Sequence, residues 1–407
     1  MSYTVQNITI KDFKSIADLT LDLGKINVHI GENGAGKSNI LEAIGVLSAA
    51  VDGRVSYAGL KERGVRLSAP EVFKIALKKQ KRKNRFALSA TLEHEIRYRV
   101  SLSPKREDTG DNIRYWTEEL KSGDVKIASR GPRGRMTIRG ERLEKPADDS
   151  SVLTAARSLS SIDENIAHAI DILQKYAIYA PSTPILRNIA TDESAKSPLG
   201  LYGGSLAPAL GTIFRSTEIK KILSTTICSL FPWIQKTGRA TPEPNLVSQH
   251  IHTGPAVIAF QDKRMLDNFN KLFAYDVSEG VLYALFLLVL ILHDGTPPFF
   301  AVDNMDSALN PRMADKLLTE AIRCIKEKPE KQMLLTTHNP AMLNAVDLFD
   351  DDIRLFVVER SEENGSTIAR RINPAAHMNR EKWRELVGNS NLANIWTSGA
   401  LGGLPNI

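Results

Sequence analysis

Cysteine is scarce in this chain of 407 residues, which contains only Cys228 and Cys324. Two cysteines that lie far apart in sequence cannot build a disulfide framework or a cysteine-based zinc site. The sequence therefore predicts two reduced, mostly buried thiols, as is usual in cytoplasmic proteins.

Long apolar runs are missing as well. The longest, 281–292, is shorter than the about 20 residues that a membrane-spanning helix requires. The first residues alternate polar and apolar side chains and lack the apolar core of a signal peptide. Residues 60–245 lack the sustained heptads that a long coiled-coil arm requires. These absences predict a cytoplasmic protein without a membrane partner.

Most familiar catalytic sets are also absent. The eight histidines show no metal-ligand spacing, and no Ser-His-Asp or Cys-His set is recognisable. The acidic cluster 350–352, with Asp347 just before it, resembles the corner of a metal-dependent nuclease. Adjacent acids on an exposed turn are more commonly solvated, which is the interpretation that we favour.

The overall composition is that of a globular protein, with 42% hydrophobic and 25% charged residues. The formal net charge of +6 permits nucleic-acid binding without being diagnostic of it. Positive charge is concentrated in 78–85 and in 130–142, which holds five arginines. These segments are either solvated loops or phosphate contacts, and the sequence leaves both interpretations open.

The clearest motif is the segment 31–38, GENGAGKS, which follows a short apolar strand at 26–30 and precedes a helix. The pattern G-x-x-x-x-G-K-S predicts a phosphate-binding loop for ATP, whose backbone N–H groups surround phosphate oxygens. Lys37 is expected to reach the β- and γ-phosphates, and Ser38 to place its hydroxyl on Mg²⁺. The predicted nucleotide-binding residues in this region are Gly31, Asn33, Gly34, Gly36, Lys37, Ser38 and Asn39.

A second motif, FFAVD at 299–303, is an apolar strand that ends in an acid. A carboxylate at a strand end beside the phosphates is suited to hold Mg²⁺, so Asp303 is predicted as a metal ligand with Ser38. Alone, such an aspartate would be an ordinary turn cap. Its pairing with the phosphate-binding loop favours the metal-binding role.

The remaining pattern predicts an α/β fold. Helices at 278–294 and 310–326 alternate with apolar strands at 299–303, 332–337 and 353–360. Strands that are apolar on both faces predict a parallel sheet covered by helices on both sides. Residues 71–145 look rich in β-strands, and residues 150–240 look helical.

Several segments resemble ABC-type ATPases. DNMDSALN at 303–310 resembles the DEPTSALD element, VSEG at 277–280 resembles the signature motif, and TTHNP at 336–340 resembles the switch-histidine segment. The opening 8–44 is similar to the SMC/RecF/OLD branch of that superfamily. The ending LANIWTSGALGGLP is similar to stand-alone bacterial ATPases of the same branch, many of which act in anti-phage defence.

The resemblance implies an ABC-type P-loop nucleotide-binding domain with a β-rich insertion and a helical insertion. Its implied parts are 1–60 and 246–407, which form the ATPase lobe, 61–150, the β-rich insertion, and 151–245, the helical insertion.

It also implies two ATP molecules between two head-to-tail subunits. Ser278 and Gly280 would bind the γ-phosphate that is held by Lys37 of the partner subunit. His338 would sense the γ-phosphate in its own subunit, and Ser307–Asn310 would communicate across the dimer. Taken alone, Ser278 would be a plain helix N-cap and His338 an ordinary histidine at a strand end.

The chain departs from this family at two points. Asn304 stands where the family has a catalytic glutamate, and an amide can orient water but cannot accept its proton. Loss of a general base costs about 10²–10⁴ in rate, so slow hydrolysis and a long-lived ATP-closed dimer are expected. Asp306 is near enough in sequence to substitute. The lid glutamine that contacts Mg²⁺ in the family has no evident counterpart, and Gln80 lies in a basic loop.

Two functions are consistent with these motifs. The first is an ATP-gated homodimer, or higher homo-oligomer, that presents or releases a separately encoded effector such as a nuclease or toxin in bacterial anti-phage defence. The second is a RecF-type DNA-repair ATPase that clamps DNA, which the basic segments would favour. An ATPase subunit of a membrane transporter fits the insertions less well.

Overall fold

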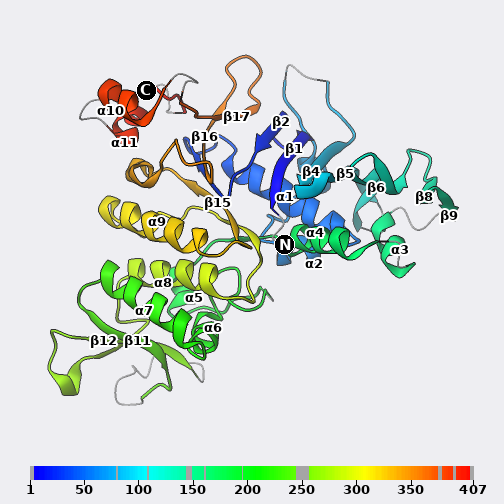
Figure 1. Ribbon diagram of the computed structural model, residues 1–407. Helices are drawn as coiled ribbons and strands as arrows, with labels where there is room; N and C mark the ends of the chain where they lie inside the picture. The colour runs from blue at the N-terminus through cyan, green and yellow to red at the C-terminus, as the bar shows by residue number, and fades with distance from the viewer. Residues whose placement is uncertain are drawn as a thin grey trace.

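The structure is a computed structural model that describes residues 4–78, 81–107, 110–143, 149–159, 162–194, 196–243, 256–374, 378–387 and 391–403. Two large β-sheets stand side by side, and a helical lobe lies below them in the view of Figure 1. Helix α1 (Lys37–Val51) packs against residues from both sheets. None of the described helices is long and apolar enough to cross a membrane.

The first sheet has six strands in the order β10-β14-β15-β3-β16-β17. Its first five strands are parallel, and β17 is antiparallel to β16. The strands are β3 (Ile26–Ile30), β10 (Ala177–Tyr179), β14 (Phe299–Val302), β15 (Gln332–Thr337), β16 (Ile353–Arg360) and β17 (Thr367–Arg371). The predicted strands at 26–30, 299–303, 332–337 and 353–360 therefore form one parallel sheet.

Both faces of this sheet are buried, because alternate residues of each strand enter different cores. Phe300 and Val302 of β14 pack in one cluster with α8 (Glu279–Leu292) and α9 (Pro311–Lys326). Phe299 and Ala301 pack in a second cluster with α1. Successive side chains of a strand point to opposite faces, and both faces of this sheet are buried. The strands must therefore be apolar throughout, as the sequence pattern predicts.

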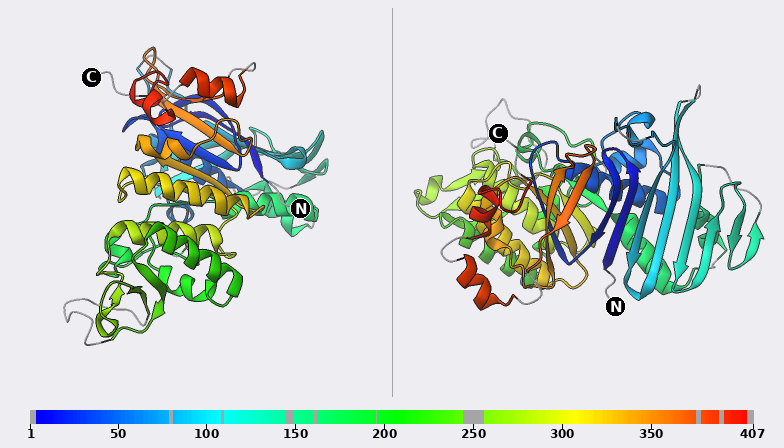
Figure 2. Two further views of the ribbon diagram at one scale, coloured as in Figure 1. Left: turned by 60° about the vertical axis from the view of Figure 1, so that its left-hand side comes forward. Right: turned by 90° about the horizontal axis from the view of Figure 1, so that it is seen from above.

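The second sheet has eight antiparallel strands in the order β2-β1-β4-β5-β6-β7-β8-β9. One face packs on α1 and α4, and the other is open, as the right panel of Figure 2 shows. The strands are β1 (Val5–Phe13), β2 (Ile16–Asp22), β4 (Phe86–Leu92), β5 (Ile96–Glu107), β6 (Gly110–Ser122), β7 (Val125–Arg130), β8 (Met136–Ile138) and β9 (Glu141–Leu143). Since β1 pairs with β4, this sheet runs across the predicted boundary after residue 60.

Shorter helical elements connect and cover the two sheets. They are α2 (Tyr57–Glu62), η1 (Pro70–Phe73), η2 (Glu93–Glu95), α3 (Val152–Ser158), α4 (Glu164–Lys175), η4 (Pro340–Ala345), α10 (Arg380–Val387) and α11 (Leu392–Thr397). Helix α11 packs on η4 beside the parallel sheet, at the top left of Figure 1.

The helical lobe combines helices with a three-stranded sheet in the order β11-β12-β13. Its elements are α5 (Thr183–Leu186), α6 (Leu206–Ile213), α7 (Thr217–Leu230), β11 (Ile234–Ala240), β12 (Val257–Asp262), η3 (Asp267–Phe269) and β13 (Lys271–Phe273). Helix α8 is apolar all round and buried at all residues after Glu279, so it forms the floor between this lobe and the parallel sheet.

The two cysteines are free, as the sequence predicts. Cys324 on α9 is buried, and burial raises the pKa of its thiol to about 11. Cys228 on α7 is half-buried. Neither thiol is therefore set up as a reactive thiolate.

Candidate functional site

The predicted site residues gather at one edge of the parallel sheet. Strand β3 runs into Gly31, β14 runs into Asp303, and β15 runs into His338. Because these strands are parallel, their carboxyl ends open onto the same edge, where ligands of open α/β sheets bind.

Glycines allow the loop 31–36 to lie close to the rest of the chain. A Cβ on Gly31 would stand 2.0 Å from the carbonyl oxygen of Val358. Gly36 has a left-handed φ of 109°, and a Cβ there would stand 2.1 Å from Thr367 Oγ1. Thr367 Oγ1 donates to the carbonyl oxygen of Ala35 at 2.8 Å. The loop is thus fixed from below by β16 and β17, which leaves its other side for a ligand.

Gly34 differs from these two glycines. Its φ is 83°, but no atom lies within 4 Å of a Cβ built there. This glycine is required by backbone conformation and not by close packing. Its neighbour Asn33, another predicted contact residue, is exposed at the tip of the loop.

Lys37 is buried at the start of α1 and bends back over the loop. Its Nζ donates to the carbonyl oxygens of Gly31 at 2.6 Å and Glu32 at 2.9 Å. Burial lowers the pKa of this ammonium, and the nearby carboxylates of Asp303 and Asp306 oppose that shift. An incoming phosphate would offer the ammonium charged acceptors in place of two neutral carbonyls.

Ser38 and Asp303, the two predicted metal ligands, are in direct contact. Ser38 Oγ donates to Asp303 Oδ2 at 2.9 Å. Thr336 Oγ1, at the end of the neighbouring strand, donates to Asp303 Oδ1 and accepts a hydrogen bond from the backbone N–H of Asn304 at 2.9 Å. The carboxylate is therefore held in a fixed orientation by two hydroxyl groups.

A hydroxyl beside a carboxylate is a donor set that suits Mg²⁺, which takes one or two protein oxygens and completes its shell with water and phosphate oxygens. Within the described ranges, no group of three or more His, Cys, Asp or Glu side chains could hold a metal ion. The acidic cluster at 350–352 forms no such group, and its Asp350 pairs with Lys326.

Asn304 is exposed and adopts a left-handed φ of 51°. Asparagine tolerates this conformation better than most residues. Asn304 directly follows Asp303 in sequence, at the position where the resemblance expects a catalytic residue.

His338 is paired with a residue that the sequence marked only as an alternative. His338 Nε2 lies 3.6 Å from Asp306 Oδ2. The imidazole is 48% exposed, whereas the side chain of Asp306 is 2% exposed. Asp306 Oδ1 has no hydrogen-bond partner among the described residues. A buried acceptor without a donor is energetically costly.

Ser278 occupies the N-cap position of α8, but its side chain makes no capping hydrogen bond. Its side chain is exposed, while Gly280 is buried and would place a Cβ 3.3 Å from the carbonyl oxygen of Ala308. In the part of the chain that is described, neither residue is hydrogen-bonded to the loop 31–38. Among the described residues, the serine hydroxyl therefore has neither a capping bond nor a bond to the loop.

A cavity of about 550 Å³ adjoins the first turn of α1. Asn39, a predicted contact residue, lines it and donates through Nδ2 to Ser15 Oγ at 2.7 Å. Glu71 is the single acid among the lining residues, which include five cations: Lys14, Arg66, Lys74, Arg82 and Arg360. Four of these cations are ion-paired, Lys14 and Arg66 with Glu42 and Lys74 and Arg82 with Glu71, so the cavity offers space beside the loop but little uncompensated positive charge.

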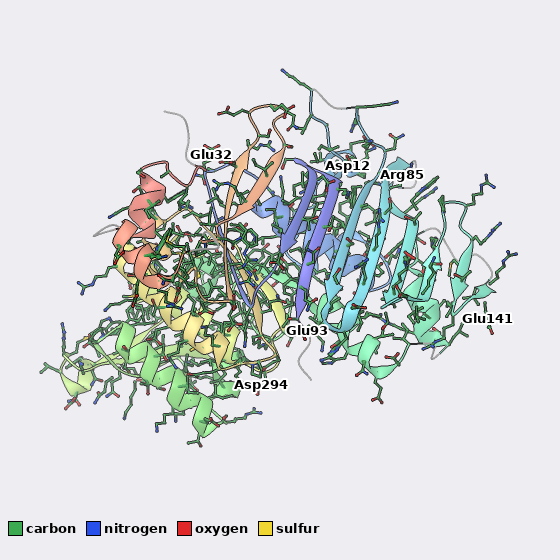
Figure 3. The ribbon with its side chains drawn as sticks, turned by 45° about the horizontal axis from the view of Figure 1, so that its top comes forward. Asp12, Glu32, Arg85, Glu93, Glu141 and Asp294 are labelled. Atoms are coloured by element: carbon green, nitrogen blue, oxygen red, sulfur yellow. The ribbon has the colours of Figure 1, made fainter. Side chains whose placement is uncertain are left out.

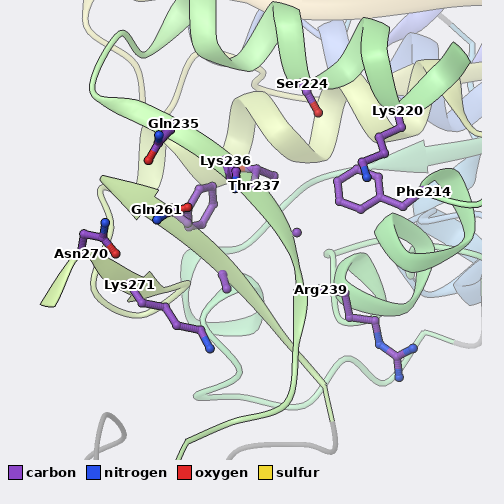
Figure 4. A pocket seen from close by; sticks show the side chains of 13 residues that line it. Phe214, Lys220, Ser224, Gln235, Lys236, Thr237, Arg239, Gln261, Asn270 and Lys271 are labelled. Carbon is purple, nitrogen blue, oxygen red and sulfur yellow. The ribbon is translucent and has the colours of Figure 1, made fainter. Parts of the chain in front are cut away.

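Other sequence features lie elsewhere. Arg130, in the second basic segment, is 2% exposed and stacks on Tyr115, so it is not part of a surface patch. Arg85 stacks on Trp116. Gln80 lies outside the described residues. A cavity of about 620 Å³ lies in the helical lobe, where its lining side chains are spread over α7, β11 and β12, and none of the predicted site residues lines it (Figure 4).

Comparison with known proteins finds two family profiles that match parts of this chain. Residues 4–176 match the family profile described as "AAA ATPase domain". Residues 260–344 match a profile described as "AAA domain, putative AbiEii toxin, Type IV TA system". Together the two matches include the phosphate-binding loop, Asp303 and His338.

Two solved structures share the fold. One is an SmcHead bound to the C-winged helix domain of ScpA, with a TM-score of 0.54 and 16% identity, covering 92% of this chain and 99% of that chain. The other is an Smc head domain with an extended coiled coil, bound to the C-terminal domain of ScpA derived from Pyrococcus furiosus. Its TM-score is 0.52 at 13% identity, covering 94% of this chain and 98% of that chain. The predicted fold class, a P-loop ATPase domain with insertions, is confirmed.

Proposed function

We propose that this chain binds ATP with Mg²⁺ at the edge of the parallel sheet and acts as an ATP-gated dimeric switch. The observation that supports nucleotide binding best is the contact of Ser38 with Asp303. It brings the end of the phosphate-binding loop to within 2.9 Å of a carboxylate 265 residues further along the chain.

Each group at the site has a role in this proposal. Backbone N–H groups of the loop and the start of α1 bind phosphate oxygens. Lys37 exchanges its two carbonyl acceptors for β- and γ-phosphate oxygens. Ser38 and Asp303 hold Mg²⁺, which neutralises phosphate charge when bound. The cavity beside Asn39 offers space for the remainder of the nucleotide.

Hydrolysis is slow in this proposal, because the residue after Asp303 is an amide. Asn304 orients water and cannot remove its proton. Asp306 is the nearest alternative carboxylate in sequence, but it is buried and faces His338. We therefore assign His338 to sensing the γ-phosphate and Asp306 to orienting His338.

The exposed position of Ser278 supports the proposal that ATP closes a dimer. Its hydroxyl is exposed, uses no capping bond and stands at the N-terminus of a buried helix. Gly280 packs against Ala308, in the segment Ser307–Asn310 that the resemblance assigns to communication across the dimer. A γ-phosphate shared between two subunits stabilises the closed dimer by ligand linkage.

The partner in this proposal is a separately encoded effector, such as a nuclease or toxin, in cytoplasmic anti-phage defence. The matched description that mentions a toxin and a type IV TA system supports that setting. The SMC heads of similar fold are each bound to another protein, ScpA, which supports a protein partner in general.

Lys37→Ala tests the site. Removing the charged donor costs about 2–3 kcal/mol, so ATP affinity should fall by about 30- to 150-fold in a calorimetric titration with Mg²⁺. Lys11→Ala, on the open face of the antiparallel sheet, is the control and should bind as the wild type does. Unchanged ATP affinity in the Lys37 variant would contradict the assignment.

The alternative function is a RecF-type ATPase that clamps DNA. A groove of about 610 Å³ on the open face of the antiparallel sheet favours it, because Lys11, Arg97 and Arg99 line that groove. DNA binding that weakens steeply with salt and strengthens with ATP would support this alternative over the effector switch. Binding that is absent at low salt would exclude it.

A further inference from the structure

The C-terminal strap, which we define as residues 391–403, contacts the phosphate-binding loop directly. Glu32, the second residue of the loop, donates its backbone N–H to the carbonyl oxygen of Gly403 at 3.0 Å. Figure 3 shows Glu32 on the same side of the molecule as the C-terminal helices. This contact joins residues 371 positions apart, at the loop that the proposed function assigns to phosphate.

The strap is shaped for this close approach. Gly403 has a φ of 74°, and a Cβ there would stand 2.5 Å from Val357 Cγ1 and 3.7 Å from Gly31 Cα. Gly402 also has a positive φ, and a Cβ there would stand 2.9 Å from Glu359 Oε2. Glycine is favoured at both positions by the positive φ, and at 403 also by the close approach to Val357 of β16.

Specific hydrogen bonds hold the strap in place. Trp396 Nε1 donates to the carbonyl oxygen of Gly402 at 3.0 Å. Glu359 Oε2 accepts the backbone N–H of Gly403 at 2.9 Å, and Arg370 donates to the carbonyl oxygen of Leu401. The strap is therefore attached to β16 and β17, the two strands that also support the loop from below.

The other end of the strap reaches the switch-histidine segment. Leu392 and Trp396 of α11 are buried in the same core as Met342 and Leu343 of η4. Helix η4 begins at Pro340, two residues after His338. The strap thus connects η4, which follows His338, with the segment that holds Glu32.

At the phosphate-binding loop, the strap is linked through Glu32 to Lys37. The backbone N–H of Glu32 donates a hydrogen bond to the strap. The carbonyl oxygen of Glu32 accepts a hydrogen bond from Lys37 Nζ. The orientation of the peptide groups on either side of Glu32 therefore sets where that carbonyl points. The strap has the contacts needed to bias Lys37 between its carbonyl partners and a phosphate.

We infer that the strap is a positioning device that couples the switch-histidine segment to the phosphate-binding loop, so that Trp396 and Gly403 tune the preference for ATP over ADP. The inference rests on the proposed function, since it assumes that the loop binds a nucleotide triphosphate. Trp396 and Gly403 act through Glu32 and Lys37, and neither touches the nucleotide in this scheme.

Trp396→Phe and Gly403→Ala test the inference by calorimetric titration of the full chain with Mg-ATP and, separately, Mg-ADP. Loss of the indole donor should reduce ATP affinity by about three- to tenfold, with a smaller effect on ADP. Gly403→Ala should have the larger effect, because the added Cβ displaces the strap. The ratio of the two affinities is the decisive measurement.

Matched controls separate coupling from general damage. Gly399→Ala lies in the same strap and carries a similar φ of 81°, but a Cβ there meets no atom within 4 Å. Trp383→Phe removes an indole from α10. Both controls should keep the wild-type ratio of ATP to ADP affinity. A lower melting temperature of the Trp396 or Gly403 variant with an unchanged ratio would overturn the inference, since a purely structural contact predicts that result.

A second measurement uses Trp396 as a reporter. The chain has four tryptophans, so replacing Trp116, Trp233 and Trp383 by phenylalanine leaves Trp396 alone. Its emission should shift differently with Mg-ATP and with Mg-ADP. Identical spectra with both nucleotides would overturn the coupling while ATP binding stood. If the wild-type chain bound no ATP, the proposed function and the coupling would both fall.

Discussion

The two large sheets of this molecule are built by different burial rules. In the parallel sheet, adjacent residues such as Phe299 and Phe300 are both fully buried, because each face has its own core. In the antiparallel sheet, Leu21 of β2 is buried while its neighbour Thr20 is exposed. Every predicted nucleotide contact lies on or beside the doubly covered sheet. Packing on both faces fixes where its strand ends lie, which a site built from several strands requires.

Helix α1 belongs to both regions and shows how they are joined. Its buried Glu42 is held by Lys14, in the turn between β1 and β2, and by Arg66. The same helix begins with Lys37 and Ser38. The open sheet thus supports the phosphate-binding helix from behind without contributing to the metal-binding pair.

The largest expected change in a rate concerns Asn304, at the edge of the parallel sheet where the proposed site lies. Asn304→Glu should raise the rate of ATP hydrolysis by about 10²-fold or more, because it supplies the general base that the proposed function lacks at this position. Asn304→Gln is the matched control, since both side chains bear the same cost of about 1–2 kcal/mol at a left-handed φ. Steady-state phosphate release measures both variants.

Two results would contradict this prediction. A wild-type rate as high as that of Asn304→Glu would mean that Asn304 does not limit hydrolysis. An equal gain in the glutamine variant would mean that shape, and not proton acceptance, is responsible. Asp306→Asn should leave a slow wild-type rate nearly unchanged if Asp306 only orients His338.

The next effect tests the doubly covered core itself. Phe299→Ala and Phe300→Ala should each lower the free energy of unfolding by about 3–5 kcal/mol, although the two side chains point to opposite faces. Urea denaturation followed by circular dichroism measures this loss. If one of the two cost less than 1 kcal/mol, one face of the sheet would not be a packed core.

The main elements of this site could be predicted because they are local in sequence. The loop 31–38, its flanking strand and helix, and Asp303 at a strand end each carry a short pattern with a physical reason. The helix expected at 278–294 is observed at 279–292, and the one expected at 310–326 at 311–326. Asp303 and Ser38 could be paired in advance since parallel strands share one edge.

Other contacts could not be predicted, because they depend on how distant segments pack. Thr336 orients Asp303 from a neighbouring strand. A threonine at a strand end has no distinctive sequence pattern, so this role could not be predicted. Gly403 meets Glu32 only after α11 has docked on η4. The pairing of β4 with β1 could not be predicted either. Alternating polar and apolar residues indicate a strand, but they do not identify the strand that pairs with it.

A smaller effect is expected from His29, which lies on β3 in the doubly covered sheet and stacks on Phe356. Burial lowers its pKa from 6.5 to about 4. The unfolded chain takes up this proton near pH 6.5 and the folded chain only near pH 4, so stability present above pH 6.5 is lost as the pH falls. The loss reaches about 3 kcal/mol near pH 4.

His29→Phe should remove that part of the acid sensitivity. Urea denaturation at pH 7 and at pH 4.5 gives the difference in stability for each variant, and His168→Gln, an exposed histidine of α4, serves as the control. If the His29 variant lost as much stability on acidification as the wild type, the proton uptake would have to be assigned to another group.

The smallest effect is expected on the open face of the antiparallel sheet. Thr20 Oγ1 lies 3.1 Å from Thr9 Oγ1 across an exposed strand pair, a contact that contributes about 0.2–1 kcal/mol. Thr20→Ala should therefore change the free energy of unfolding by less than about 1 kcal/mol, whereas Leu21→Ala, one residue further on, should cost about 2–5 kcal/mol. Equal costs at the two positions would mean that the outer face is covered in solution, for example by a second copy of the chain. A Thr20 cost that rises with protein concentration would identify that contact.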